Sequence, residues 1–152
     1  MVEVKEGVYG INNCTDLLRK AHYDFKKCQS NINPYDIFNL ACTLYHIVDW
    51  VESDDRIPQE VRKDSKSVRN QPEIRCMRGL CNKSKHFKLT KCPNPQMNID
   101  GGWGGFNWGE REWGSSPTYL VEMNGSDIDL MLVAEKALSL LDQFMQKHRL
   151  ME

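Results

Sequence analysis

Four polar residues in the middle of the chain have the side-chain chemistry needed to cleave a phosphodiester bond without a metal. Arg78, Asn82 and His86 follow one another at i, i+4 spacing, which places them along one edge of a helix, and Lys85 precedes His86. His86 is the candidate general acid or base, and Arg78 and Lys85 are candidates to stabilise charge on the phosphate. Asn82 would orient the phosphate or the attacking hydroxyl. The alternative is a hydrated helix face on which the dipole favours a cation at the C-terminal end.

The helix expected over 34–51 has one ordinary side and one unusual side. Its apolar stripe, which predicts a core face, consists of Leu40, Ala41, Leu44, Val48 and Val51. The opposite side carries His46, Asp49 and Trp50, where a surface helix normally carries Lys and Glu. Asp49 is the only formal charge between residues 37 and 51. We therefore expect these three side chains to be largely buried.

Two arrangements of His46 and Asp49 are compatible with this pattern. In the first, both residues join His86 in a metal site, because an i, i+3 His and carboxylate pair plus a second His is an acceptable ligand set. In the second, Asp49 pairs with Arg75 or Arg78 and His46 donates to a backbone carbonyl. We favour the second arrangement, in which the three residues of the helix form a structural or secondary site.

The cysteines do not predict a metal centre. Cys76, Cys81, His86 and Cys92 fall within seventeen residues, but zinc needs its first two thiolates in a tight turn, and Cys76 and Cys81 fall in a helical pattern. All six cysteines are expected to be reduced thiols. Motifs for nucleotides, dinucleotides, serine hydrolases and zincins are absent from the sequence, so no cofactor is expected.

A glycine-rich segment gathers three of the four tryptophans, Trp103, Trp108 and Trp113, at five-residue intervals. Large aromatic side chains on such a backbone could stack on a base, a sugar or a partner protein. The alternative is a hairpin whose tryptophans cover the open side of the helices. Glu110 and Glu112 make this segment a poor binder of phosphate, which leaves a protein or a nucleobase as the expected partner.

The candidate site residues are placed by the helices that carry them, and the starts of these helices can be predicted from the sequence. A start is marked by a side-chain oxygen at the N-cap and an acid three residues later. Such pairs begin at Asn13, Asn33, Asn70 and Ser126. They predict helices near 14–30, 34–51, 71–87 and 127–148. We expect 52–69 to be a mostly exposed connection and 93–125 to be a Gly/Trp-rich β-hairpin region closed by a turn at Asn124-Gly125. The predicted fold is a predominantly helical α+β domain spanning 1–152, a four-helix bundle with a small hairpin or sheet before the last helix.

Composition limits the classes of function. Hydrophobic residues make up 40% of the chain and charged residues 27%, with a net charge of −1. These values are typical of one globular domain. The start of the chain lacks a signal-peptide pattern and no apolar run approaches the length of a membrane span, so we expect a cytoplasmic protein without a membrane partner. Nucleic-acid binding would need a local basic patch. The sequence leaves the oligomeric state open.

Two segments carry a resemblance to known proteins. They are His46-x-x-Asp49-Trp50 and Asn82-x-x-Lys85-His86-Phe87. Together they resemble a group of small uncharacterised bacterial and phage-associated proteins, over the second and third expected helices. More distantly, the basic helix that ends at His86 is similar to HEPN domains, helical bundles that often act as metal-independent ribonucleases through an Arg-x4-6-His motif. This chain departs from that motif, because seven residues separate Arg78 from His86.

The resemblance to the uncharacterised group implies a fold and no reaction. With the more distant similarity to HEPN domains, we expect a role in bacterial conflict, such as phage defence, or in RNA metabolism. Our first hypothesis is a HEPN-like ribonuclease, or a protein that has kept that scaffold to bind RNA. The alternative is a non-enzymatic module that binds a protein or a ligand through the Gly/Trp-rich segment.

Overall fold

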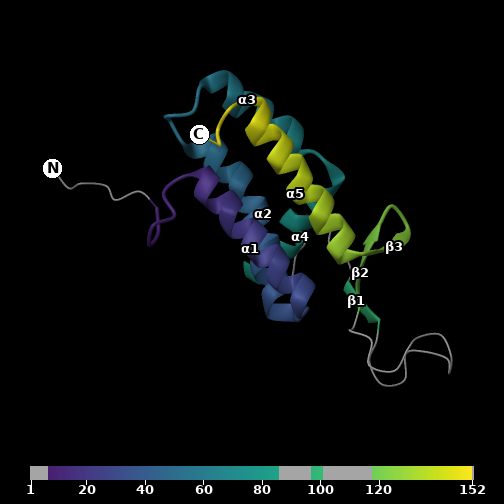
Figure 1. Ribbon diagram of the computed structural model, residues 1–152. Coiled ribbons are helices and arrows are strands. Elements are labelled where there is room, and N and C mark those ends of the chain that lie inside the picture. Colours follow the sequence, from purple (N-terminus) through teal and green to yellow (C-terminus); the bar gives the residue numbers. More distant parts are fainter. Residues whose placement is uncertain (1–6, 86–96, 101–117, 152) are drawn as a thin grey trace, which may run out of the picture.

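The computed structural model describes residues 7–85, 97–100 and 118–151 of the chain, which form a helical bundle with a small sheet at one end (Figure 1). The helices are α1 (Cys14–Ser30), α2 (Pro34–Ser53), α3 (Gln59–Arg69), α4 (Pro72–Lys85) and α5 (Leu130–Lys147). The strands are β1 (Met97–Asp100), β2 (Thr118–Met123) and β3 (Ser126–Asp129). The predominantly helical α+β class is confirmed. Within the described part of the chain there are five helices, one more than expected.

The additional helix is α3, in a segment that we expected to be a mostly exposed connection. Its buried side chains are Val61, Ser65 and Val68, spaced so that all three face the bundle. The helix places a narrow apolar stripe against its neighbours, while Glu60, Lys63 and Lys66 are exposed to solvent. Because the segment is short and rich in charge, its composition hides this stripe.

The first two predicted helix starts are confirmed. The side chain of Asn13 accepts a hydrogen bond from the backbone N–H of Asp16 at 2.8 Å, and Asn33 accepts from the N–H of Asp36 at 3.0 Å. Each bond satisfies an amide that has no partner inside the helix. These two caps fix the residues at which α1 and α2 begin.

The other two predicted starts are wrong. Asn70 ends α3, where its N–H donates to Lys66, and α4 begins at Pro72. Ser126 begins strand β3, and Asp129 caps α5 by accepting from the N–H of Met131 at 2.8 Å. In the second case the same residues continue the hairpin before the helix begins, so tertiary pairing overrides the local capping signal.

The core lies around α2, which packs against the other four helices. The predicted stripe of α2 is confirmed, since its members are all 2% exposed or less. Helix α4 runs back along α2 toward the end of the bundle where α2 and α5 begin. There Met77 and Leu80 lie beside Leu40, Ala41 and Leu130.

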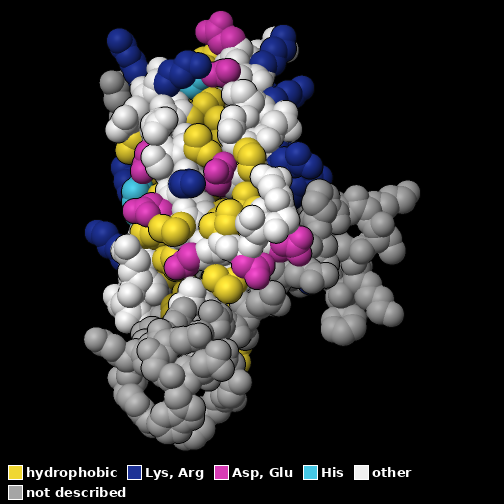
Figure 2. All heavy atoms as spheres, turned by 90° about the vertical axis from the view of Figure 1, so that its right-hand side faces the viewer, with side chains coloured by type: hydrophobic (Ala, Val, Ile, Leu, Met, Phe, Trp, Pro, Cys, Tyr) yellow, Lys and Arg dark blue, Asp and Glu magenta, His cyan; other side chains and the backbone are white. Residues whose placement is uncertain are grey.

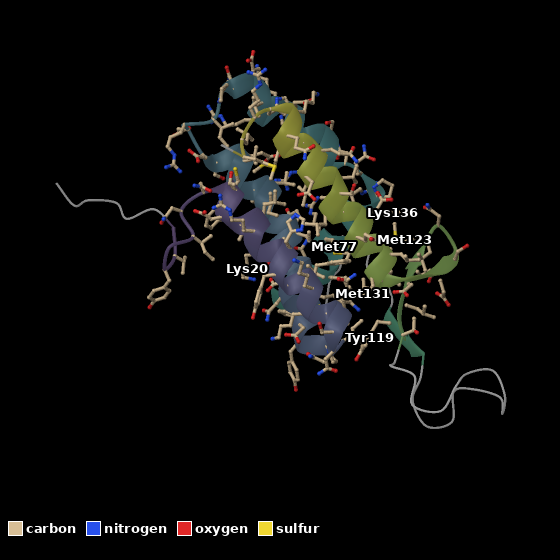
Figure 3. The ribbon with its side chains drawn as sticks, in the orientation of Figure 1. Lys20, Met77, Tyr119, Met123, Met131 and Lys136 are labelled. Atoms are coloured by element: carbon tan, nitrogen blue, oxygen red, sulfur yellow. The ribbon has the colours of Figure 1, made fainter. Side chains whose placement is uncertain are left out.

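The sheet is antiparallel in the order β1-β2-β3, and the two strands β2 and β3 form a hairpin. Its turn is the predicted Asn124-Gly125 pair, with φ of 54° and 78°, the left-handed geometry that this pair favours. Tyr119 and Val121 of β2 are buried, and β2 packs against α5. Figure 3 shows Tyr119 on β2 and Met131 on α5 at the end of the bundle where α5 begins.

The surface is mixed in character. On the face shown in Figure 2, acidic and basic side chains are intermingled with apolar ones. None of the helices in residues 7–85 and 118–151 has the length and hydrophobicity required to cross a bilayer.

Candidate functional site

The outer side of α2 opens into a cavity of about 580 Å³, which we call the α2 cleft. Helix α2 contributes His46, Asp49, Trp50 and Ser53 to its wall, and the turn that follows contributes Asp54, Asp55 and Arg56. The opposite wall is the segment that leads into α1, with Asn12 and Asn13. The volume lies within the range of about 300–1,000 Å³ that is typical of small-molecule sites.

A second hollow of about 230 Å³ continues from this cleft along the groove between α1 and α2. His46 and Trp50 line both hollows. Lys20 of α1 also lines the second hollow, where it donates to the Thr43 hydroxyl of α2 at 2.7 Å (Figure 3 labels Lys20). His46 and Trp50 therefore form the wall that the two hollows share.

The expectation that His46, Asp49 and Trp50 are largely buried is wrong in degree, because all three are half-buried. The Asp49 side chain retains 38% of its exposure. The turn after α2 and the segment before α1 flank these side chains without covering them. This face of α2 has few charged side chains because it lines a cavity, and not because it is buried in the core.

Asp49 forms its ion pair with Arg69 of α3, and not with Arg75 or Arg78 as predicted. Asp49 Oδ1 accepts from Arg69 Nη2 at 2.6 Å. Arg69 also donates from Nε and Nη2 to the two oxygens of Glu52, each at 2.9 Å. The prediction failed because it treated the segment that carries Arg69 as an exposed connection.

Arg69 is held from a third side by Tyr45. Its Nη1 donates to the Tyr45 hydroxyl at 2.8 Å, and its guanidinium carbon lies 5.4 Å from the centre of the Tyr45 ring. Burial opposes the charge of Arg69, but the hydrogen bonds to Glu52 and Asp49 outweigh it and raise the pKa of the guanidinium. Arg69 thus fastens α3 to α2 and fixes the position of Asp49 in the wall of the cleft.

His46 contacts the thiol of Cys81 on α4, with 3.6 Å between Nε2 and Sγ. The prediction of a backbone carbonyl partner is therefore wrong within the described part of the chain. The His46 ring also lies against that of Tyr45, with 5.8 Å between centroids. Because Cys81 is fully buried, this contact anchors one edge of the imidazole while the ring remains in the wall of the cleft.

Asp54 and Arg56 also line the cleft, and no pattern in the sequence singled them out. Arg56 donates from Nε and Nη2 to the two carboxylate oxygens of Asp54, each at 2.8 Å, and from Nη2 to the Asn12 carbonyl at 3.2 Å. The hydrogen bond from Arg56 lowers the pKa of Asp54. This bridge joins the turn after α2 to the segment before α1. An Asp-x-Arg triplet is common on surfaces, so the sequence held no signal for it.

The predicted ribonuclease residues are described only in part. Arg78 is exposed and Asn82 half-exposed on α4, whereas His86 and the Lys85 side chain lie outside the described residues. The predicted binding residues of the Gly/Trp-rich segment, namely Trp103, Trp108 and Trp113, also lie outside them. The predicted catalytic group and the predicted aromatic surface therefore stay predictions.

The described residues offer no metal centre. Within 7–85, 97–100 and 118–151 there is no group of three or more His, Cys, Asp or Glu side chains placed to hold a metal ion. Cys76 and Cys81 are both buried on α4, and burial raises the pKa of the Cys76 thiol to about 12. His86 and Cys92, which complete the predicted ligand sets, lie outside the described part.

Comparison with known proteins adds no assignment to this geometry. The resemblance to HEPN domains stays a prediction, and the α2 cleft has to be interpreted from its own residues. No family model matches the chain, and no curated protein or solved structure matches it either.

Proposed function

We propose that this protein is a binding module that takes a small polar ligand in the α2 cleft. The observation that carries the proposal is the shared wall of His46 and Trp50, half-buried beside a cavity of about 580 Å³. A half-buried tryptophan beside an open cavity offers a flat apolar surface to a ligand, and polar groups around it set the orientation.

The rigidity of the polar groups supports this proposal. Asp49 is fixed by Arg69, and Asp54 is fixed by Arg56. His46 is anchored through Cys81. A site whose side chains are already held in place loses little conformational entropy when a ligand binds. The cleft is therefore organised for binding before any ligand enters.

A matched pair of variants on one helix tests the proposal. A set of small cationic, neutral and anionic compounds is first screened for compounds that raise the thermal midpoint. Each compound found is then titrated calorimetrically into wild type, Trp50→Ala and Tyr35→Ala. Tyr35 is also an aromatic residue of α2, but it is 82% exposed and lies outside the cleft.

We expect Trp50→Ala to weaken binding by about tenfold or more and Tyr35→Ala to leave it unchanged. If every bound compound keeps its affinity in Trp50→Ala, ligands do not use the α2 cleft and the proposal fails.

RNA binding along α4 is a second candidate, favoured by one observation. Arg75 and Arg78 are exposed on the same side of α4 and form no ion pair with any residue in the described part of the chain. Asn82, half-exposed, continues this edge of the helix. Uncommitted guanidinium groups in a row can contact consecutive phosphates. This candidate keeps the HEPN-like ribonuclease as a proposal, with His86 as its proton carrier.

A further inference from the structure

We infer that the α2 cleft selects an organic cation, an ammonium or guanidinium group, over neutral and anionic groups of the same shape. The inference rests on the proposed function and specifies the class of ligand. Among the described residues, the carboxylates of Asp49, Asp54 and Asp55 line the cleft, and each is paired with a guanidinium, that of Arg69, Arg56 and Arg62 respectively. Arg69 is shared with Glu52, so four carboxylates meet three guanidinium groups around the cleft. The wall thus carries an excess of negative charge.

The nearby guanidinium groups are already engaged. Arg56 donates from Nε and Nη2 to Asp54, and from Nη2 also to the Asn12 carbonyl. Arg69 donates from all three of its nitrogens to groups on α2. Among the described residues, an anion entering the cleft would therefore meet carboxylates and no uncommitted cation.

Asp49 offers a carboxylate oxygen that can accept from a bound cation. Only its Oδ1 accepts from Arg69, and its Oδ2 accepts no hydrogen bond from any described residue. This oxygen belongs to the residue that precedes Trp50, and both side chains line the cleft. A cation bound in the cleft can therefore contact a carboxylate and an aromatic ring, and both interactions stabilise an ammonium or guanidinium group.

Choline and its neutral isostere 3,3-dimethyl-1-butanol test charge selection at constant shape. Methylguanidinium and N-methylurea form a second pair for a planar head group, and acetate is the anionic probe. Each compound is titrated calorimetrically into wild type, Asp49→Asn and Glu122→Gln. Asparagine keeps an oxygen for Arg69, and Glu122 is an exposed carboxylate on β2, outside the cleft.

We expect at least one cation to bind about tenfold more tightly than its neutral isostere, and acetate not to bind. Asp49→Asn should reduce the affinity for the cation to that of the isostere, whereas Glu122→Gln should leave it unchanged. Thermal midpoints show whether Asp49→Asn is folded. If it is not, Trp50→Phe against Trp50→Leu replaces it, and loss of the cation preference only in Trp50→Leu supports the inference.

The two proposals fail in different ways. If neutral isosteres bind as tightly as cations and Trp50→Ala abolishes both, the cleft is a binding site and the charge inference is wrong. If binding of all probes survives Trp50→Ala, the proposed function itself is wrong. The cation could come from a free small molecule or from a lysine side chain of a protein. The blocked tripeptide Gly-Lys-Gly, titrated alongside choline, separates these two sources, because the peptide should bind more tightly than choline only if the ligand is a protein side chain.

Discussion

Arg69, the last residue of α3, donates to Asp49 on α2 across 2.6 Å. This ion pair links α3, which the sequence did not predict, to Asp49, one of the residues that line the cleft. Arg69 also donates hydrogen bonds to Glu52 and Tyr45, so one side chain contacts three residues of α2 along successive turns. The position of Asp49 therefore depends on the packing of α3, and this relation leads to a first prediction.

Arg69→Ala should lower the free energy of unfolding by about 1–3 kcal/mol, because it leaves Asp49 and Glu52 close together without a cation. Urea denaturation followed by circular dichroism measures the change. Arg75→Ala is the control, since Arg75 is exposed on α4 and should change stability by about 0.5 kcal/mol or less. Equal losses in both variants would show that the Arg69 network contributes nothing specific.

The C-terminal end of α5 predicts a dependence of stability on pH. Lys147 and His148 hydrogen-bond to Asp64 of α3 and lower its pKa from 3.8. A carboxyl with a lowered folded pKa stabilises the protein above its unfolded pKa, and that stabilisation is lost as the pH falls through the folded value. Wild type should therefore lose stability relative to Asp64→Asn as the pH drops below about 4.

Thermal midpoints between pH 2 and pH 7 test this dependence. Asp127→Asn, an exposed change on β3, is the control and should follow the wild-type curve. A constant difference between wild type and Asp64→Asn over the whole range would mean that the ion pairs of Asp64 do not contribute to folding.

Thiol reactivity should follow burial. Burial raises the pKa of Cys76 to about 12 and that of Cys28 to about 11, so both remain protonated and enclosed at neutral pH. Half-exposed Cys42 should react with a disulfide reagent such as Ellman's first, in a Cys92→Ser background that removes the one cysteine outside the described residues. Mass mapping of the labelled sites measures the order, and reaction of Cys76 as fast as Cys42 would contradict the packing of α4.

The second candidate function predicts a separate effect on RNA. In the presence of EDTA, Arg78→Ala should weaken binding of single-stranded RNA by about tenfold or less, the effect of losing one phosphate contact. His86→Ala should abolish any cleavage and leave the thermal midpoint unchanged. Lys136→Ala, an exposed cation on α5, is the control. Equal cleavage by all variants would indicate a contaminating nuclease, and absence of cleavage in wild type would exclude the ribonuclease.

Local signals predicted the parts of the fold that depend on neighbours in the sequence. The caps at Asn13 and Asn33 and the turn at Asn124-Gly125 each need only a few consecutive residues, and each is confirmed. The start of α5 was misplaced because strand pairing of β3 with β2 competes with the cap at Ser126. That competition is a tertiary effect, which a capping pattern does not contain.

The candidate site was predictable only as a set of residues. The sequence singled out His46, Asp49 and Trp50 because their helix face lacks charges, and these residues line the same cavity. The sequence did not predict which residues surround them, because the cleft forms where Arg56 joins the turn after α2 to Asn12. That bond connects segments far apart in the chain, and no periodic pattern predicts it.

The indole N–H signal of Trp50 in a ¹H–¹⁵N spectrum tests the central claim most directly. Trp50→Phe assigns the signal among the four tryptophans of the chain. The protein is then titrated with choline and with a mixture of small neutral polar fragments. We expect a saturable shift of the Trp50 signal with at least one of these ligands, together with shifts of the His46 and Asp49 amides. Binding that leaves the Trp50 signal unmoved, or a Trp50 signal unmoved by every ligand tested, would contradict it.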